Sequence, residues 1–213
     1  MWTEKYRPVD LGKLIGNDDV RGKFNQWLRT WKTSSKPALL QGPPGVGKTT
    51  LGRRIAPELG LPFIDSDSEV EKTAGCTIGE IFKNSGEKIF RDIERGVMLR
   101  LLSQSPAVIG SGGGSFMDVN TRNLIGKKGT SIWLRADLEI LYRRARHRTH
   151  RPLLNNNDQR KILMRLMKER HAVYQKADLI FDVTEEPPDK MAIKLVETLT
   201  NYGIKNKKVA PAK

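Results

Sequence analysis

The sequence predicts an α/β fold in which a parallel sheet is covered by helices on both faces. Short apolar runs alternate with segments of helical periodicity along most of the chain. A glycine-rich phosphate-binding motif at residues 42–49 lies where the first apolar run gives way to a helix. Such alternation is typical of parallel sheets, because each crossover helix returns the chain to the end of the sheet where the next strand can start in the same direction. Since ligands of these sheets bind beyond the carboxyl ends of the strands, functional residues are expected there.

Each expected element follows from its local pattern. The strands are the short apolar runs at residues 38–41, 62–65, 107–110, 131–134 and 179–183. The helices are expected at residues 48–59, 77–83, 87–102, 138–146, 159–177 and 188–202. Before the first strand, apolar residues recur at helical spacing from Asn17 to Trp31, where Asn17 can serve as the N-cap of an amphipathic helix. We therefore expect a P-loop domain at 37–202, a helical extension at 1–36 and a basic, disordered tail at 203–213.

Length and composition agree with a single folded domain that carries an appendage. The chain has 213 residues, of which 38% are hydrophobic and 29% charged, as in folded rather than disordered proteins. No run approaches the roughly 18 apolar residues of a membrane span, and the N-terminus lacks the apolar centre of a signal peptide. The single cysteine, Cys76, cannot form an internal disulfide, and the three histidines give no zinc-binding pattern. We expect a cytoplasmic protein without a structural metal.

Basic residues are in excess, with 38 Lys and Arg against 24 Asp and Glu, a formal net charge of +14. The densest cluster consists of Arg143, Arg144, Arg146, Arg148 and Arg151. Thr149 and Pro152 interrupt this cluster, so we predict a mobile basic loop that faces phosphate. Charge alone leaves a second interpretation open, namely a solvated surface or one that attracts nucleic acid.

The strongest functional signal is Gly-Pro-Pro-Gly-Val-Gly-Lys-Thr at residues 42–49, which matches the phosphate-loop pattern G-x-x-x-x-G-K-[ST]. Its glycines allow backbone N–H groups to converge on phosphate oxygens at a helix N-terminus. Lys48 can reach the β- and γ-phosphates, and the Thr49 hydroxyl can hold Mg²⁺. The residues expected to bind the nucleotide here are Gly42, Gly45, Val46, Gly47, Lys48, Thr49 and Thr50. The motif indicates a nucleoside triphosphate but leaves the reaction open.

Residues after the second and third strands suggest a second substrate. Asp65 and Asp67 occupy alternate positions at the end of the second strand, and we expect their side chains to diverge. One would face the water shell of Mg²⁺ and the other the second substrate. Gly112, Gly113 and Gly114 follow the third strand and let a ligand approach the backbone, although a flexible hinge would have the same sequence.

Two charged positions on predicted helices have both a structural and a functional interpretation. Arg91 and Glu94 lie three residues apart, so they share a helix face and form either an ordinary ion pair or part of a binding site. Arg170 lies on the long helix after the basic loop, where a surface charge is the alternative.

Taken together, these residues resemble the shikimate kinase family, from the P-loop to about Tyr202. The motifs that carry the resemblance are Asp65-Ser66-Asp67, Ile81-Phe82 with Gly86-Glu87, Phe90-Arg91 with Glu94, Gly112-Gly113-Gly114, Arg151-Pro152-Leu153-Leu154, and Arg170 with Tyr174. The resemblance implies ATP-dependent phosphorylation of the 3-hydroxyl of shikimate in aromatic amino-acid biosynthesis. It also implies a five-stranded parallel sheet, with ATP and Mg²⁺ as cofactors.

The same resemblance implies a role for each residue. On the nucleotide side, Lys48 and Thr49 would serve ATP and Mg²⁺, Asp65 would support the metal through water, and Arg144 would lie against adenine. On the acceptor side, the residues would contact shikimate, orient another side chain or line the pocket. Asp67 would contact the hydroxyls as the base, Arg91 and Arg170 would clamp the carboxylate, Glu94 would orient Arg91 or a hydroxyl, and the backbone of Gly112, Gly113 and Gly114 would line the pocket.

A lid at about residues 146–158 is also implied, from which Arg151 would reach the transferring phosphate. Lys48, Asp67 and Arg151 would then form the catalytic set. The chemistry supports this independently, because phosphoryl transfer chiefly needs positioned groups that neutralise charge.

The first 51 residues resemble a different family, the large subunit of archaeal clamp loaders, which are AAA+ ATPases. The resemblance rests on Trp2-Thr3-Glu4-Lys5-Tyr6-Arg7-Pro8, on the helix through Trp31 and on residues 42–50. The two resemblances meet within the P-loop or its helix, so we predict a composite chain. A natural fusion, an engineered one and an artefact of assembly all remain open.

Two alternative functions follow from these patterns. One is a related small-metabolite kinase, for instance one for gluconate, because two arginines do not distinguish between acids. The other is a clamp-loader-like ATPase that acts with DNA, which would need a second acidic strand end, a helical lid domain and an arginine finger. The sequence contains none of these patterns, and Ser111 with three glycines follows the third strand. We expect shikimate as the partner of a monomer that binds neither membrane nor nucleic acid.

Overall fold

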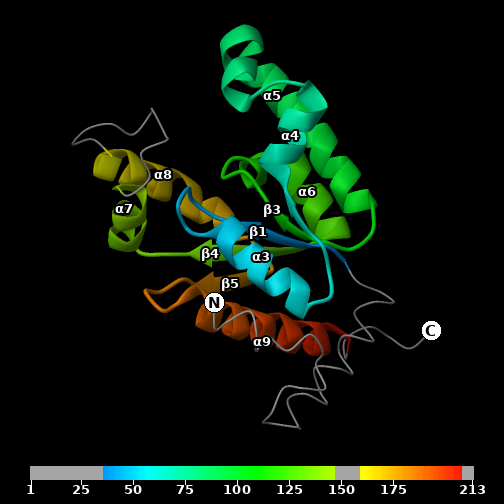
Figure 1. The fold of residues 1–213 in the computed structure, drawn as a ribbon, viewed down its shortest axis with the longest axis vertical. Helices are drawn as coiled ribbons and strands as arrows, with labels where there is room; N and C mark the ends of the chain where they lie inside the picture. The colour runs from blue at the N-terminus through cyan, green and yellow to red at the C-terminus, as the bar shows by residue number, and fades with distance from the viewer. Residues whose placement is uncertain (1–35, 147–158, 208–213) are drawn as a thin grey trace, which may run out of the picture. The chain divides into compact units, whose positions relative to one another are not determined.

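The computed structural model describes residues 36–146 and 159–207, all within one unit of the chain that spans Ser35–Lys213 (Figure 1). The predicted N-terminal helix at 17–31, the loop at 147–158 with Arg151, and residues 208–213 lie outside the described residues.

Five parallel strands form the centre of this unit, as the sequence predicts. They are β1 (Ala38–Gln41), β2 (Phe63–Asp65), β3 (Val108–Gly110), β4 (Thr130–Arg135) and β5 (Leu179–Asp182). Their order is β2-β3-β1-β4-β5, so the chain leaves the central strand β1 toward one edge and later returns to build the other. This reversal opens a crevice at the carboxyl end of β1, which is where the phosphate-binding motif begins.

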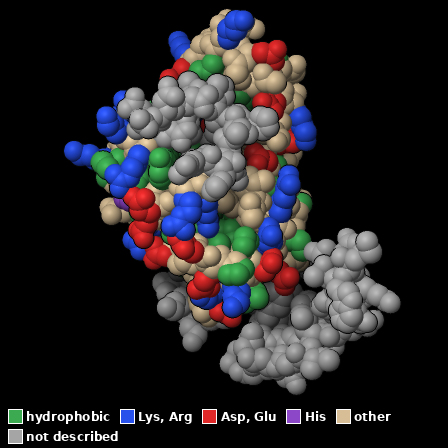
Figure 2. Space-filling view, turned by 60° about the vertical axis from the view of Figure 1, so that its left-hand side comes forward, with side chains coloured by type: hydrophobic (Ala, Val, Ile, Leu, Met, Phe, Trp, Pro, Cys, Tyr) green, Lys and Arg blue, Asp and Glu red, His purple; other side chains and the backbone are tan. Residues whose placement is uncertain are grey.

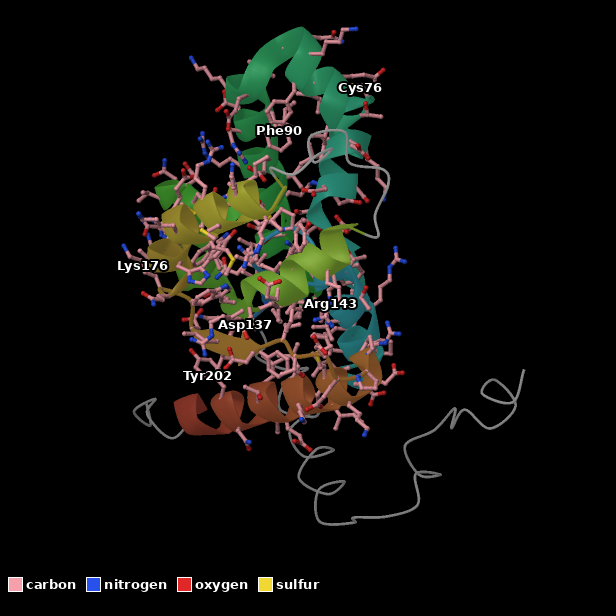
Figure 3. All side chains as sticks on the ribbon, turned by 90° about the vertical axis from the view of Figure 1, so that its left-hand side faces the viewer. Cys76, Phe90, Asp137, Arg143, Lys176 and Tyr202 are labelled. Atoms are coloured by element: carbon pink, nitrogen blue, oxygen red, sulfur yellow. The ribbon has the colours of Figure 1, made fainter. Side chains whose placement is uncertain are left out.

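Helices cover both faces of the sheet. They are α3 (Lys48–Glu58), α4 (Ser66–Ala74), α5 (Ile78–Ser103), the 3₁₀ turn η2 (Ser115–Met117), α6 (Val119–Lys128), α7 (Leu138–Arg146), α8 (Gln159–Tyr174) and α9 (Pro188–Lys207). Helix α3 packs on one face together with α9, whereas α5, α6 and α8 supply the core of the other. The α4–α5 pair stands out beyond the sheet, with Cys76 and Phe90 on it (Figures 1 and 3). Among the described residues, none of the helices combines the length and apolar character that a membrane crossing requires.

The central strand is buried on both faces, because it carries apolar residues without alternation. Leu39 packs with Ile109 and Trp133 against α5, α6 and α8. On the opposite face, α3 approaches the sheet closely at Gly52, where a Cβ would overlap the ring of Phe63. This tight packing places the N-terminus of α3, and with it the phosphate loop, at the end of β1.

Helix α4 corrects the prediction for the second strand. Asp65 ends β2 and is the N-cap of α4, because its Oδ1 accepts a hydrogen bond from the backbone N–H of Asp67 at 3.1 Å. Asp67 therefore lies in the first turn of a helix and not at an alternate position of the strand. The prediction that Asp67 belongs to the strand is wrong, because the capping carboxylate turns the chain into a helix at this point. The two side chains nevertheless lie against different groups, Asp65 against the Thr49 hydroxyl and Asp67 against the loop at Gly112.

Three further differences concern helix limits. The turn η2 and helix α6 were not predicted. Only Thr121 and Ile125 of α6 are buried, so its apolar pattern is weak. Asp118 is the N-cap of α6, because its Oδ1 accepts a hydrogen bond from Thr121 N at 2.7 Å. The two helices predicted at 77–102 form α5, which breaks at Gly86 (φ 78°, ψ 175°). Helix α9 continues to Lys207, so the predicted disordered tail cannot begin at Gly203. A glycine weakens a helix by only about 1 kcal/mol, and no proline follows before residue 211.

Candidate active site

A cavity of about 500 Å³ opens at the carboxyl ends of β1, β2 and β3. The phosphate loop lines one side of it. Asp65 and Asp67 come from the end of β2 and the start of α4, and Ser111, Gly112 and Gly113 come from the segment after β3. Three segments that are far apart in the sequence thus meet where a parallel sheet is expected to bind its ligands.

The backbone of the phosphate loop requires glycine. Gly42 has φ 146°, and a Cβ at this position would lie 2.6 Å from the carbonyl oxygen of Leu134. Gly47 has φ 101° and is the N-cap of α3, without any side chain that caps the helix. The first N–H groups of α3 therefore point toward the loop and can bind an anion, aided by the positive end of the helix dipole.

Lys48 and Thr49 place complementary groups beside this loop. The ammonium of Lys48 donates to the carbonyl oxygens of Gly42 at 2.7 Å and Pro43 at 3.2 Å, so it lies over the loop itself. The hydroxyl of Thr49 donates to Asp65 Oδ2 at 3.1 Å. A hydroxyl and a carboxylate at this distance are hard oxygen ligands of the kind that Mg²⁺ uses together with water and phosphate.

These residues fit a bound Mg²⁺–nucleotide. The described parts of the chain contain no group of three or more His, Cys, Asp or Glu side chains that could hold a metal alone. Mg²⁺ does not need such a cage, because in phosphate-transfer sites it is held by one or two protein oxygens and by the phosphates of the substrate. The oxygens of Thr49 and Asp65, next to a helix N-terminus that its N-cap residue does not cap with a side chain, match this mode of binding.

Arg144 on α7 contacts the other side of the phosphate loop. Its Nη1 donates to Val46 O at 3.1 Å, and its Nη2 donates to Thr184 O at 3.0 Å, just after β5. The guanidinium therefore joins the loop to the segment that leads into α9. Its contact with adenine stays a prediction.

The three glycines after β3 bring the predicted acceptor residues together. A Cβ at Gly112 would lie 2.8 Å from Asp67 Oδ1, and a Cβ at Gly114 would lie 2.6 Å from Arg91 Nη1. A Cβ at Gly113 would lie 3.3 Å from Arg170 Nη1. Side chains from α4, α5 and α8 thus contact the loop where glycine leaves room for them. This supports the pocket-lining interpretation over a simple hinge.

Arg91 and Glu94 form the ion pair that their spacing predicts, and the pair also faces the glycine loop. Arg91 Nη1 lies 2.8 Å from Glu94 Oε2, and Arg91 Nη2 lies 3.1 Å from the exposed Glu87 Oε1. Burial by itself would lower the pKa of Arg91, but the hydrogen bonds to Glu94 and Glu87 outweigh it and raise that pKa. The guanidinium is therefore held in its charged form, as binding of a carboxylate requires.

Arg170 is partly buried and is not a simple surface charge. Its Nη1 donates to Gly113 O at 3.1 Å, and the hydroxyl of Tyr174 donates to the same oxygen at 2.5 Å. Tyr174 is buried against Trp133, and its burial raises the pKa of the phenol, although Arg170 opposes this effect. The phenol thus remains a hydrogen-bond donor that fixes the middle of the glycine loop.

Two buried serines of the site were missed by the sequence analysis. Ser66 Oγ accepts from Gly112 N at 3.1 Å, and Ser115 Oγ donates to Glu94 Oε1 at 2.5 Å. The only signal in the sequence is their position, between the two aspartates and directly after the three glycines. Arg151 and the predicted lid lie outside the described residues, so the site as described holds the phosphate loop and the acceptor residues.

Comparisons with known proteins agree with this geometry. The family model for shikimate kinase matches residues 44–200. Shikimate kinase of Paramagnetospirillum magneticum is 47% identical over 164 residues, which cover 77% of this chain and 84% of that protein. Shikimate kinase of Brucella canis is 45% identical over 168 residues, 79% of this chain and 84% of that protein.

Solved structures show the same fold. Shikimate kinase from Acinetobacter baumannii in complex with shikimate superposes with a TM-score of 0.75 at 31% identity, covering 82% of this chain and 97% of that one. A gluconokinase from Sinorhizobium meliloti reaches a TM-score of 0.51 at 18% identity over 80% of this chain, which is a likeness of fold alone. The family match begins inside the phosphate loop, so the clamp-loader resemblance of residues 1–51 stays a prediction. From the phosphate loop to α9, the sequence, the order of the strands and the composition of the pocket agree, and the chain belongs to the shikimate kinase family.

Proposed function

We propose that this protein transfers the γ-phosphoryl group of ATP to the 3-hydroxyl of shikimate and forms shikimate 3-phosphate for aromatic amino-acid biosynthesis. The observation that carries the proposal is the glycine loop after β3. One carboxylate, Asp67, lines the cavity together with Gly112 and Gly113. Two guanidinium groups, Arg91 and Arg170, lie against the same loop at Gly114 and Gly113. A hydroxylated carboxylic acid has the groups that this set would bind.

On the nucleotide side, the residues of the phosphate loop and Thr50 bind ATP through backbone N–H groups and the charge of Lys48. Thr49, and Asp65 through water, would hold Mg²⁺, which would supply positive charge against the phosphates. The ammonium of Lys48 hydrogen-bonds to the loop carbonyls, so it can turn to a phosphate oxygen and remain at the loop. Arg144 keeps the loop in place from α7. The predicted lid with Arg151, which lies outside the described residues, would supply a further positive charge to the phosphate.

On the acceptor side, Arg91 and Arg170 hold the carboxylate, because a planar guanidinium can donate two parallel hydrogen bonds to it. Asp67 accepts the proton of the attacking hydroxyl or attracts it electrostatically. Glu94 keeps Arg91 in orientation through the contact at 2.8 Å. The backbone of Gly112, Gly113 and Gly114 forms the wall against which the ring lies.

Release of ADP should depend on shikimate. In a coupled assay with the full chain, ATP and Mg²⁺, we expect turnover with shikimate and only background release with gluconate or primed DNA. The gluconate and DNA arms represent the two alternative functions. Turnover that responds to gluconate or DNA and not to shikimate would contradict the proposal.

A clamp-loader function is not supported by the end of β3. This strand leads into Ser111 and three glycines, so it lacks the acidic pair that would activate water. On the face shown in Figure 2, basic and acidic side chains of the described residues are interspersed and do not form one basic patch. A cytoplasmic monomer that binds neither membrane nor nucleic acid stays a prediction, and gel filtration checks the monomer.

We further propose that the chain consists of an extension at 1–36 that resembles a clamp loader, a kinase domain that begins at 37 and includes all of α9 to Lys207 rather than ending at 202, and a basic tail after it. A chain that begins at Ser35 should then keep its shikimate-dependent activity within about threefold, because every described residue of the site lies after Lys36. Circular dichroism and the coupled assay check this. A truncated chain that is folded but inactive would contradict it, and an unfolded one would show that the extension is part of the core.

A further inference from the structure

The carboxylate of Glu94 is buried deeply for a charged group, with 4% of the residue exposed. Both of its oxygens are engaged. Oε2 accepts from Arg91 Nη1 at 2.8 Å, and Oε1 accepts from the hydroxyl of Ser115 at 2.5 Å. A buried carboxylate without such donors is costly, so each donor determines where Glu94 can lie.

Ser115 is itself held in place from two sides. Only 1% of the residue is exposed, and its backbone N–H donates to Gly112 O at 3.2 Å, which closes the turn of the three glycines. The residue is also the first of the 3₁₀ turn η2, whose carbonyls at Phe116 and Met117 accept from Arg122 Nη1 at 2.7 and 3.0 Å. The hydroxyl of Ser115 is therefore a fixed donor and can transmit the position of the loop to Glu94.

Arg91 depends on Glu94 for its place. Its second carboxylate partner within the described residues, Glu87, has a side chain that is 66% exposed, so this contact restrains the guanidinium weakly. The ring of Phe90, 5.0 Å from the guanidinium carbon, supports one face of the group but does not fix the direction of its N–H bonds. The guanidinium lies directly against Gly114. A small shift of Glu94 would consequently move Arg91 toward solvent or into the backbone of the loop.

We propose that Ser115 is a positioning residue for the acceptor. It holds Glu94, and through Glu94 it holds the guanidinium of Arg91 where the acceptor carboxylate binds. Ser115 does not touch the substrate. This inference rests on the proposed function, since Arg91 must be a carboxylate partner for the chain of contacts from Ser115 to matter.

Ser115→Ala tests the proposal in the full-length protein. We expect the KM for shikimate to rise about tenfold, because a hydrogen bond to a buried charged group is lost, while kcat and the KM for ATP stay within twofold. The kcat is spared because Arg91 binds the acceptor carboxylate, not the phosphate that is transferred. Normal kinetics for all three parameters would overturn the proposal, and so would a fall in kcat at an unchanged KM for shikimate.

Ser131→Ala is the matched control. Ser131 is also buried and its hydroxyl also donates to a carboxylate, Asp178 Oδ2, at 2.6 Å, but it lies near the amino end of β4, at the end of the sheet opposite the cavity. This variant should lower the melting temperature about as much as Ser115→Ala and leave the KM for shikimate unchanged. An equal rise in KM for both variants would mean that a general loss of stability, and not positioning, explains the effect.

A double-mutant cycle with Glu94→Ala separates the pathway from other effects of Ser115. If Ser115 acts through Glu94, then adding Ser115→Ala to Glu94→Ala should change the KM for shikimate by less than twofold. A further tenfold rise would show that Ser115 acts by another route. Should Glu94→Ala fail to fold, the comparison of Ser115→Ala with Ser131→Ala remains decisive. Failure of the proposed function would look different, because the unaltered protein would then not phosphorylate shikimate at all.

Discussion

Replacing Lys48 by alanine should lower kcat about a thousandfold. The ammonium group lies over the phosphate loop, at 2.7 Å from Gly42 O, and can follow the negative charge that develops on the phosphate during transfer. Removal of one preorganised donor of this kind typically costs 10²–10³ in rate. The coupled assay at saturating shikimate measures the effect.

Lys72→Ala is the control for the loss of a positive charge. Lys72 lies on α4, is exposed and pairs with Glu69 at 2.7 Å. Its replacement should leave kcat within twofold. If Lys48→Ala kept more than a tenth of the activity, the lysine would not serve the transferring phosphate.

Asp67→Asn should lower turnover about a hundredfold and leave the affinity for shikimate within about tenfold. The substitution keeps the shape of the side chain but removes the negative charge that accepts or attracts the proton of the hydroxyl. The carboxylate already lies at the glycine loop, 2.8 Å from where a Cβ of Gly112 would be, so the variant should still form the pocket. Calorimetric titration with shikimate and the coupled assay separate binding from turnover.

Asp92→Asn provides the matched control for this substitution. Asp92 lies on α5, has an exposed carboxylate and pairs with Arg95 at 3.2 Å. We expect its loss to change neither binding nor turnover by more than twofold. Near-normal turnover of Asp67→Asn would mean that Asp67 is not the base and that positioning alone carries the reaction.

The nucleotide half of the site could be predicted from the sequence because its determinants are local. The apolar run at 38–41, the glycines and the Lys48-Thr49 pair are contiguous, and a strand, a turn and a helix N-terminus follow from them without reference to the rest of the chain. The five strands were found for a similar reason, since each is a short apolar run. The central strands β1 and β3 and most of β4 are buried on both faces, whereas the edge strands β2 and β5 are only partly buried. Membership of the shikimate kinase family was also predicted, from motifs in a characteristic order.

The limits of several elements could not be predicted, because weak local signals competed. Residues 66–74 follow the strand directly, and the capping contact from Asp65 to Asp67 N decides that they form a helix. Helix α6 buries too few apolar residues to show a helical pattern. In both cases the deciding contact is a hydrogen bond from a side chain that caps the helix. Such a cap stabilises a helix by about 1 kcal/mol, and apolar periodicity does not reveal it.

The sequence by itself determined the succession of the five strands, the phosphate loop and membership of the shikimate kinase family, because each of these is encoded in a short stretch of chain or in a family motif. The acceptor residues were predicted from the same motifs, but α4, η2 and α6 were missed, and only the tertiary structure decided which of the predicted acceptor residues lie together. Arg170 reaches Gly113 across 57 positions of sequence, and Ser115 reaches Glu94 across 21. Local sequence could not choose between an ion pair and a binding site for Arg91, or between an exposed surface charge and a partly buried, hydrogen-bonded one for Arg170. The physical reason is that burial and hydrogen-bond partners arise only when α4, α5 and α8 close around a loop without side chains.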